Sequence, residues 1–133
     1  MPFYADADTF YAVIKEVFER MEKDSPRAIA VLMRSKMIVR FKLTHPLAEI
    51  LLNGRRAAFQ ATYGPSKMMA ELEAHFAGDT LHKIFLGQWT LAHALNSGQL
   101  RLNGPIFKAL ELADLFQAAK TIYPVVLKER GLL

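Results

Sequence analysis

A closely spaced set of glycines in residues 86–104 restricts the fold of this chain more than any other feature. Gly87, Gly98 and Gly104 bound two short segments. In the first segment apolar residues recur at helical spacing, and Thr90 is placed to cap a helix. In the second, apolar and polar residues alternate, which is typical of a half-buried strand. A helix, a tight stop, a strand and a sharp turn must therefore fit into this stretch, and glycine suits such corners because it reaches positive φ without a steric clash.

The length and composition predict one domain over residues 1–133. Because the chain has no cysteine, disulfides and thiolate metal sites are excluded. No apolar run approaches the roughly 20 residues that a membrane-spanning helix needs, and the first residues lack the pattern of a signal peptide. We therefore expect a soluble, cytoplasmic protein without a transmembrane segment.

The N-terminal part is predicted to form two helices over residues 9–34. Apolar residues from Phe10 to Met21 follow the i, i+3, i+4 pattern of an amphipathic helix, which Asp8 or Thr9 can cap. Ser25 and Pro26 are typical of the cap and first residue of a second helix.

Residues 36–76 are predicted to form strands. Alternation begins at residue 36 and gives that strand one basic face. Asn53-Gly54 is a strong hairpin signal, and a two-residue turn there would place Leu52 opposite Arg55. Residues 68–76 are ambiguous, because their propensity favours a helix whereas Leu72, Ala74 and Phe76 alternate with polar residues.

The C-terminal part, residues 79–122, is predicted to contain short helices, the strand described above and a long helix over 106–122. The apolar positions of that helix change sides, so its first half should bury Ile106 and Leu110 and its second half Leu115 and Phe116. Tyr123-Pro124 is expected to break the helix. Residues 123–133 then form an apolar tail, as a lid or a dimer contact.

The basic residues have an uneven distribution within a net charge of +4. Residues 27–56 contain one acidic residue, Glu49, and seven basic residues: Arg27, Arg34, Lys36, Arg40, Lys42, Arg55 and Arg56. Such a stretch can attract anionic head groups or nucleic acid. Without interleaved aromatic residues for stacking, a solvated sheet face is the favoured interpretation, and no nucleic-acid partner is expected.

No catalytic or metal-binding constellation is evident in the sequence. The four histidines lack metal-ligand spacing, and no serine has the context of a nucleophile. We expect no enzyme activity, no metal and no cofactor. If the protein were an enzyme acting on a lipid-like substrate, His82, His93 and Tyr63 would be the candidate polar groups.

The glycine-punctuated stretch, with the apolar residues between its glycines, resembles the sterol carrier protein (type two) family of lipid-binding domains. The resemblance runs without gaps over residues 70–116, and it implies a strand from about residue 70 that leads to a helix capped by Asp79-Thr80. It implies an α+β fold, in which helices cover one face of a five-stranded, mostly antiparallel twisted sheet. It also implies a hydrophobic cavity between sheet and helices that holds a fatty acid, acyl chain, sterol or isoprenoid-like lipid.

The ligand-binding residues that this resemblance implies are apolar: Phe59, Phe76, Leu81, Ile84, Phe85, Trp89, Leu91, Leu95, Leu102, Ile106, Phe107, Leu110 and Phe116. The expected function is non-catalytic binding or transfer of a hydrophobic small molecule, with transient membrane contact. The same residues can instead form a solid core. The alternative function is then a protein–protein interaction domain of the same fold, in which the apolar tail forms a homodimer.

Overall fold

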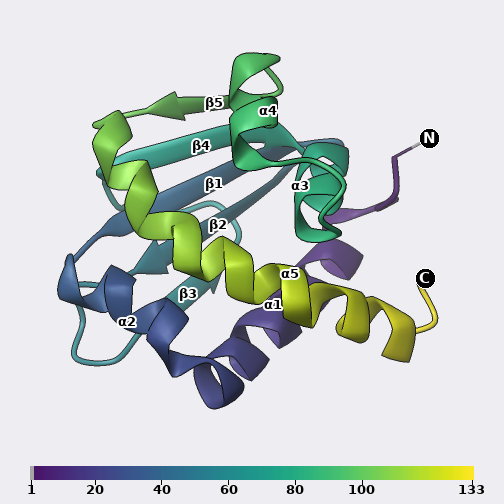
Figure 1. Ribbon diagram of the computed structural model, residues 1–133, viewed down its shortest axis with the longest axis horizontal. Helices are drawn as coiled ribbons and strands as arrows, with labels where there is room; N and C mark the ends of the chain where they lie inside the picture. Colours follow the sequence, from purple (N-terminus) through teal and green to yellow (C-terminus); the bar gives the residue numbers. More distant parts are fainter. Residues whose placement is uncertain (1) are drawn as a thin grey trace.

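The computed structural model describes residues 2–133 as a five-stranded sheet with helices packed on one face (Figure 1). The strands are β1 (Ile38–Thr44), β2 (Ala48–Asn53), β3 (Gln60–Tyr63), β4 (Leu72–Ala77) and β5 (Leu100–Asn103). The helices are α1 (Ala7–Asp24), α2 (Pro26–Arg34), α3 (Gly78–Phe85), α4 (Leu91–Asn96), the 3-10 helix η1 (Ile106–Leu112) and α5 (Ala113–Glu129). The fold is α+β, as the sequence predicts.

The sheet has the strand order β3-β2-β1-β4-β5, and every neighbouring pair is antiparallel except β1 and β4. Odd-numbered residues of β1 and even-numbered residues of β4 point toward the helices, where Val39, Phe41, Ala74 and Phe76 are buried. The alternation that predicted both strands is thus confirmed. It arises because successive side chains of a strand point to opposite faces.

The predicted two-residue hairpin at Asn53-Gly54 is wrong. Strand β3 begins six residues after Gly54, and Leu52 pairs with Ala61 instead of Arg55. A Cβ on Gly54 would lie 2.6 Å from the Leu32 carbonyl oxygen. The Gly54 N–H donates a hydrogen bond to the Met37 carbonyl oxygen. Glycine is therefore needed at position 54 because the backbone passes close to the end of α2, not because a turn there requires positive φ.

The N-terminal helices form as predicted, but their first cap differs. Helix α1 begins at Ala7, and the Asp6 carboxylate accepts a hydrogen bond from the Thr9 N–H at 2.7 Å. Asp6 is therefore the N-cap, not Asp8 or Thr9. Pro26 occupies the first turn of α2 as expected.

The predicted Asp79-Thr80 cap of α3 is also wrong, since the helix already starts at Gly78 and Ala77 is its N-cap. The Asp79 carboxylate instead accepts a hydrogen bond from the Phe3 N–H at 2.8 Å. It therefore ties the start of the chain to α3. Thr90, by contrast, caps α4 as predicted, because its hydroxyl oxygen accepts the His93 N–H at 3.0 Å.

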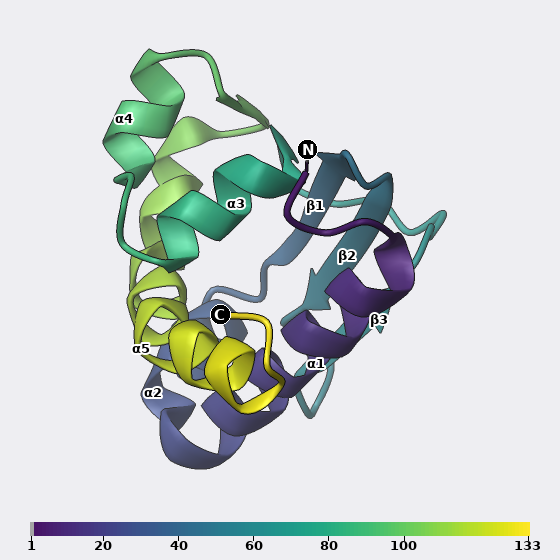
Figure 2. The same cartoon turned by 90° about the vertical axis from the view of Figure 1, so that its right-hand side faces the viewer.

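The C-terminal segment differs from the predicted single helix over 106–122. It starts as the 3-10 helix η1 and becomes α-helical at Ala113, and α5 continues through Pro124 to Glu129. Burial in the core overrides the cost of that proline, because Tyr123, Val126 and Leu127 are all buried. Most of the predicted tail is thus a helix packed against α1 (Figure 2). Within residues 2–133, no helix has the length and apolar character that crossing a bilayer requires.

The predicted basic strand face is only partly solvated. Arg40 is 7% exposed and forms ion pairs with Glu73 at 2.7 Å and Glu49 at 3.4 Å. Its guanidinium also donates to the carbonyl oxygens of Ser66 and Met68. Arg40 therefore fixes the crossover between β3 and β4 against the sheet face opposite the helices, the open face.

Candidate functional site

An apolar cavity lies between the sheet and its helical layer, and η1, α4 and α5 contribute to its walls. Its volume is about 40 Å³. Every lining residue is apolar: Phe41, Ala74, Leu91, Leu95, Leu100, Leu102, Ala109, Leu112 and Phe116. A dry, apolar cavity of this kind favours hydrocarbon over water.

Four predicted site residues meet at this cavity, namely Leu91, Leu95, Leu102 and Phe116. Leu91 and Leu95 lie one helical turn apart on α4, so both face the same side. Leu102 points inward from β5, opposite Ala74 of β4. The glycine-bounded helix and strand thus supply three of these four residues.

Other predicted residues lie in the core beside the cavity. Phe116 contacts Phe41 and Phe85 edge to face, with ring centroids 5.9 and 5.4 Å apart. Phe76, Leu81, Ile84 and Phe85 are all buried. Trp89 and Ile84 line a separate hollow of about 200 Å³ that is also bounded by Leu91 and Phe116.

The remaining predicted residues do not line the cavity. Phe59 is half-buried and packs near Phe18, in a hollow beside α2. Ile106, Phe107 and Leu110 are 68%, 71% and 78% exposed. The prediction that the first half of the C-terminal helix buries Ile106 and Leu110 is wrong. In a 3-10 helix the residue spacing per turn is three, so the buried positions differ from those of an α-helix.

Sequence reasoning missed five lining residues as ligand-contacting candidates: Phe41, Ala74, Leu100, Ala109 and Leu112. The sequence signal that could have identified Phe41, Ala74 and Leu100 is the alternation along β1, β4 and β5, which places all three on the apolar face of the sheet. The change from η1 to α5 brings Ala109 and Leu112 to the cavity, and no local sequence signal marks it.

Helix α4 is a weakly anchored part of the cavity wall. It has six residues, and only Ala94 among them is buried. It lies between Gly87 and Gly98, both at φ +78°. Leu95 is 39% exposed although it lines the cavity. Few buried contacts imply a low free energy of local opening.

The three polar groups that the sequence offers for catalysis lie elsewhere, and Tyr63 is on β3, at the sheet edge opposite β5. His82 Nδ1 and the Tyr123 hydroxyl are 2.6 Å apart, and the Tyr123 hydroxyl is 2.7 Å from that of Tyr4. Burial lowers the pKa of His82 and raises the pKa of Tyr4 to about 12. His93 instead packs edge to face against Trp89, and none of these groups lines the apolar cavity. Among residues 2–133, no three His, Asp or Glu side chains are grouped to hold a metal ion.

Comparisons with known proteins agree with this architecture. No protein-family model matches the chain, and no curated protein matches it. Solved structures do match. The sterol carrier protein domain 2 of Helicoverpa armigera has a TM-score of 0.66 at 18% identity, over 84% of this chain and 87% of that domain.

Two further solved structures place the same fold in different settings. A ubiquinone synthesis protein, UbiJ-SCP2, gives a TM-score of 0.61 at 18% identity, over 92% of this chain and 95% of that one. The sec-alkylsulfatase Pisa1 from Pseudomonas sp. gives 0.54 at 18% identity, over 68% of this chain but only 14% of the enzyme. The chain therefore has the fold of the sterol carrier protein 2 domains, as the glycine-punctuated stretch predicted.

Proposed function

We propose that this protein binds a hydrophobic small molecule, such as a fatty acid, acyl chain, sterol or isoprenoid-like lipid, between its sheet and helices, without catalysis. The all-apolar lining of the cavity under α4 carries this proposal. Each methylene group transferred from water into such a site contributes about 0.8 kcal/mol. A lining without polar groups cannot distinguish similar lipids strongly, so we expect broad selectivity.

The ligand-bound form requires the cavity to enlarge. A volume of about 40 Å³ holds little more than one water molecule, whereas small-molecule pockets span roughly 300–1,000 Å³. Helix α4 and η1 supply Leu91, Leu95, Ala109 and Leu112, and both cover the cavity on the side away from the sheet. Their separation would extend the cavity without disturbing the β1–β4 pairing.

Exposed apolar side chains support entry at the same place. Ile106, Phe107 and Leu110 project from η1 into solvent, and Leu95 is partly exposed on α4. These side chains belong to α4 and η1, which also supply residues that line the cavity. Exposed apolar surface is typical of ligand entrances and membrane contacts. Their exposure therefore supports loading from a membrane surface.

Leu95→Trp tests the proposal. The larger side chain would fill the cavity from α4, so uptake of a fluorescent fatty acid should fall at least tenfold while circular dichroism stays unchanged. Met69→Trp is the matched control, because it adds a tryptophan at a side chain that is 86% exposed between β3 and β4, outside the cavity and outside α4 and η1. Its uptake should match that of the unmodified protein. Equal uptake by both variants would exclude this cavity as the binding site.

Mass spectrometry of the organic extract of protein purified without added lipid supplies the ligand class. A lipid retained at near-stoichiometric amounts and lost in Leu95→Trp supports the proposal. An extract without lipid, together with no fatty-acid uptake, would contradict it.

A further inference from the structure

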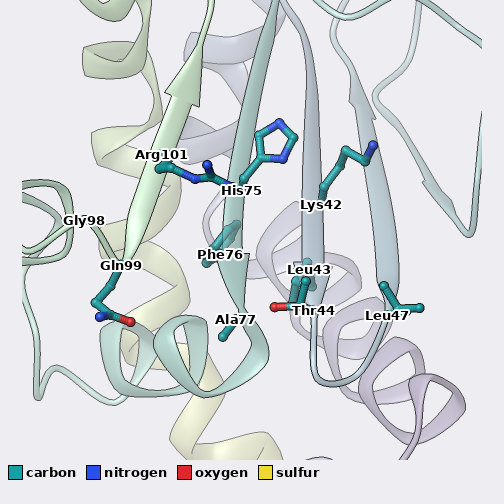
Figure 3. Close-up of a pocket in the computed structure, with 10 residues that line it drawn as sticks. All are labelled: Lys42, Leu43, Thr44, Leu47, His75, Phe76, Ala77, Gly98, Gln99 and Arg101. Carbon is teal, nitrogen blue, oxygen red and sulfur yellow. The ribbon is translucent and has the colours of Figure 1, made fainter.

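A second and larger hollow lies on the open face of the sheet, at the end where β1 and β4 finish and β5 starts (Figure 3). Its volume is about 530 Å³, which lies within the range of small-molecule pockets. Lys42, His75 and Arg101 stand in one row across it, because Lys42 pairs with His75 and His75 with Arg101 in the strand register. The hollow shares no lining residue with the apolar cavity.

The cations at the two ends of this row are unpaired. Among residues 2–133, neither Lys42 nor Arg101 has a carboxylate within 4.0 Å. Glu49, which lies opposite Lys42 in the register of β1 and β2, is already engaged by another cation, as are Glu71 and Glu73. Arg40 holds Glu49 and Glu73, and Arg55 and Lys108 hold Glu71.

His75 is oriented by its neighbours within the same sheet. Its Nε2 atom lies 3.3 Å from the Glu73 carboxylate and 3.1 Å from the Asn103 amide nitrogen. These contacts hold the ring between the two unpaired cations. The row therefore places two cations without ion-pair partners on β1 and β5, whose backbones lie about 10 Å apart by the spacing of strands.

We propose that this hollow binds the phosphate group of an amphiphilic organic phosphate. Arginine offers paired donors that match phosphate oxygens, and lysine adds a compact charge. A phosphate bound beside His75 would lie between the two strands, and the Lys42 side chain, which extends away from Arg101 in Figure 3, would have to turn toward it. The Thr44 hydroxyl and the Gln99 amide also line the hollow and supply neutral hydrogen bonds.

The apolar part of the ligand follows from Leu47. This side chain is 81% exposed at the edge of the hollow. A neighbouring hollow of about 260 Å³ shares Lys42, Leu43 and Leu47 with the first and contains Glu49, which repels anions. The phosphate therefore belongs on the Arg101 side and an aliphatic group on the Leu47 side. Phe76 is the one Phe, Tyr or Trp that lines this hollow and is 6% exposed, so no large aromatic face is offered to a nucleobase and an alkyl or isoprenyl phosphate fits better than a nucleotide.

Titration calorimetry and amide chemical shifts test this assignment with three probes: hexyl phosphate, inorganic phosphate and hexanol. We expect hexyl phosphate to bind most tightly and to shift the amides of Thr44, His75 and Arg101. Its affinity should fall as salt is raised. If inorganic phosphate binds as tightly as hexyl phosphate, the proposal that the ligand has an apolar part is overturned.

The double variant Lys42→Gln/Arg101→Gln should weaken hexyl phosphate binding at least tenfold. Lys15→Gln is the matched control, because Lys15 is exposed on α1 and lines neither hollow. Unchanged affinity in the double variant, or shifts confined to α4 and η1, would overturn the proposal. Fatty-acid uptake measured on the same double variant should stay unchanged, so failure at this site is distinguishable from failure at the apolar cavity.

Discussion

Arg40→Met removes the cation that joins β1 to β2, β4 and the crossover between β3 and β4. Methionine keeps a long apolar stem at this position, so the side-chain packing is largely retained. The variant loses the ion pairs with Glu73 and Glu49 and the hydrogen bonds to the carbonyl oxygens of Ser66 and Met68. The expected effect is loss of stability without loss of topology.

The magnitude follows from burial. Breaking a fully buried pair costs about 3–5 kcal/mol, because the remaining charge has no partner. The Arg40 side chain is 9% exposed, but those of Glu49 and Glu73 are 24% and 29% exposed, so water can solvate both carboxylates in the variant. We therefore expect the free energy of unfolding to fall by about 2–3 kcal/mol.

Urea denaturation followed by circular dichroism measures this loss, with Arg101→Met as the matched control. Arg101 lies on the same face but is exposed and forms no ion pair within residues 2–133. Its replacement should change the free energy of unfolding by less than about 0.5 kcal/mol. A loss below about 1 kcal/mol in Arg40→Met would refute the assignment of Arg40 as the anchor of the crossover.

The pH dependence supplies an independent check. The hydrogen bond from Arg40 lowers the pKa of Glu73 below its ordinary value of 4.5. A carboxyl group with a lower pKa in the folded state stabilises the protein above the unfolded-state pKa and loses this contribution as pH falls through the folded-state pKa. The unmodified protein should therefore lose stability more steeply below about pH 4.5 than Arg40→Met does. Parallel pH profiles would contradict the proposed coupling.

Two further substitutions test other parts of the fold by urea denaturation. Gly104→Ala should destabilise the protein by more than about 2 kcal/mol, because a Cβ there would lie 2.3 Å from the Glu71 carbonyl oxygen at φ +121°. Gly98→Ala, at φ +78° with nothing within 4 Å, should cost only about 1 kcal/mol, and equal costs would contradict the steric argument. Tyr123→Phe removes hydrogen bonds to His82 and Tyr4 and should cost about 1–3 kcal/mol. A loss within about 0.5 kcal/mol would show that this buried network is not stabilising.

The sequence predicted those parts of the fold in which a local pattern and the tertiary contacts agree. The strand at 72–77 is an example: its residues favour a helix by propensity, but Leu72, Ala74 and Phe76 alternate as a half-buried strand requires. Thr90 is another, since its cap depends only on the next three residues. Four predicted site residues come together for the same reason, because α4 and β5 each have a local signal.

The predictions that failed depend on contacts between distant residues. No local signal shows that Gly54 lies against the Leu32 carbonyl. The predicted partner of Leu52, Arg55, is therefore six residues before the actual partner, Ala61. The predicted inward-facing residues of β3 are still correct, because a shift of six residues is even and strand side chains alternate with a period of two. The basic stretch likewise finds acidic partners far along the chain, in Glu73 on β4 and in Glu71 just before it. Pro124 stays inside α5 because its neighbours are buried.

The parallel pairing of β1 with β4 also constrains how the protein is made. Val39 pairs with Leu72, 33 positions later (72 − 39 = 33), and β5 completes the sheet only beyond that. During synthesis, β1 to β3 leave the ribosome first, and β1 then has one side without hydrogen-bond partners. Such an edge can pair with another nascent chain. The pairing of β4 with β1 is therefore the step that ends this exposure.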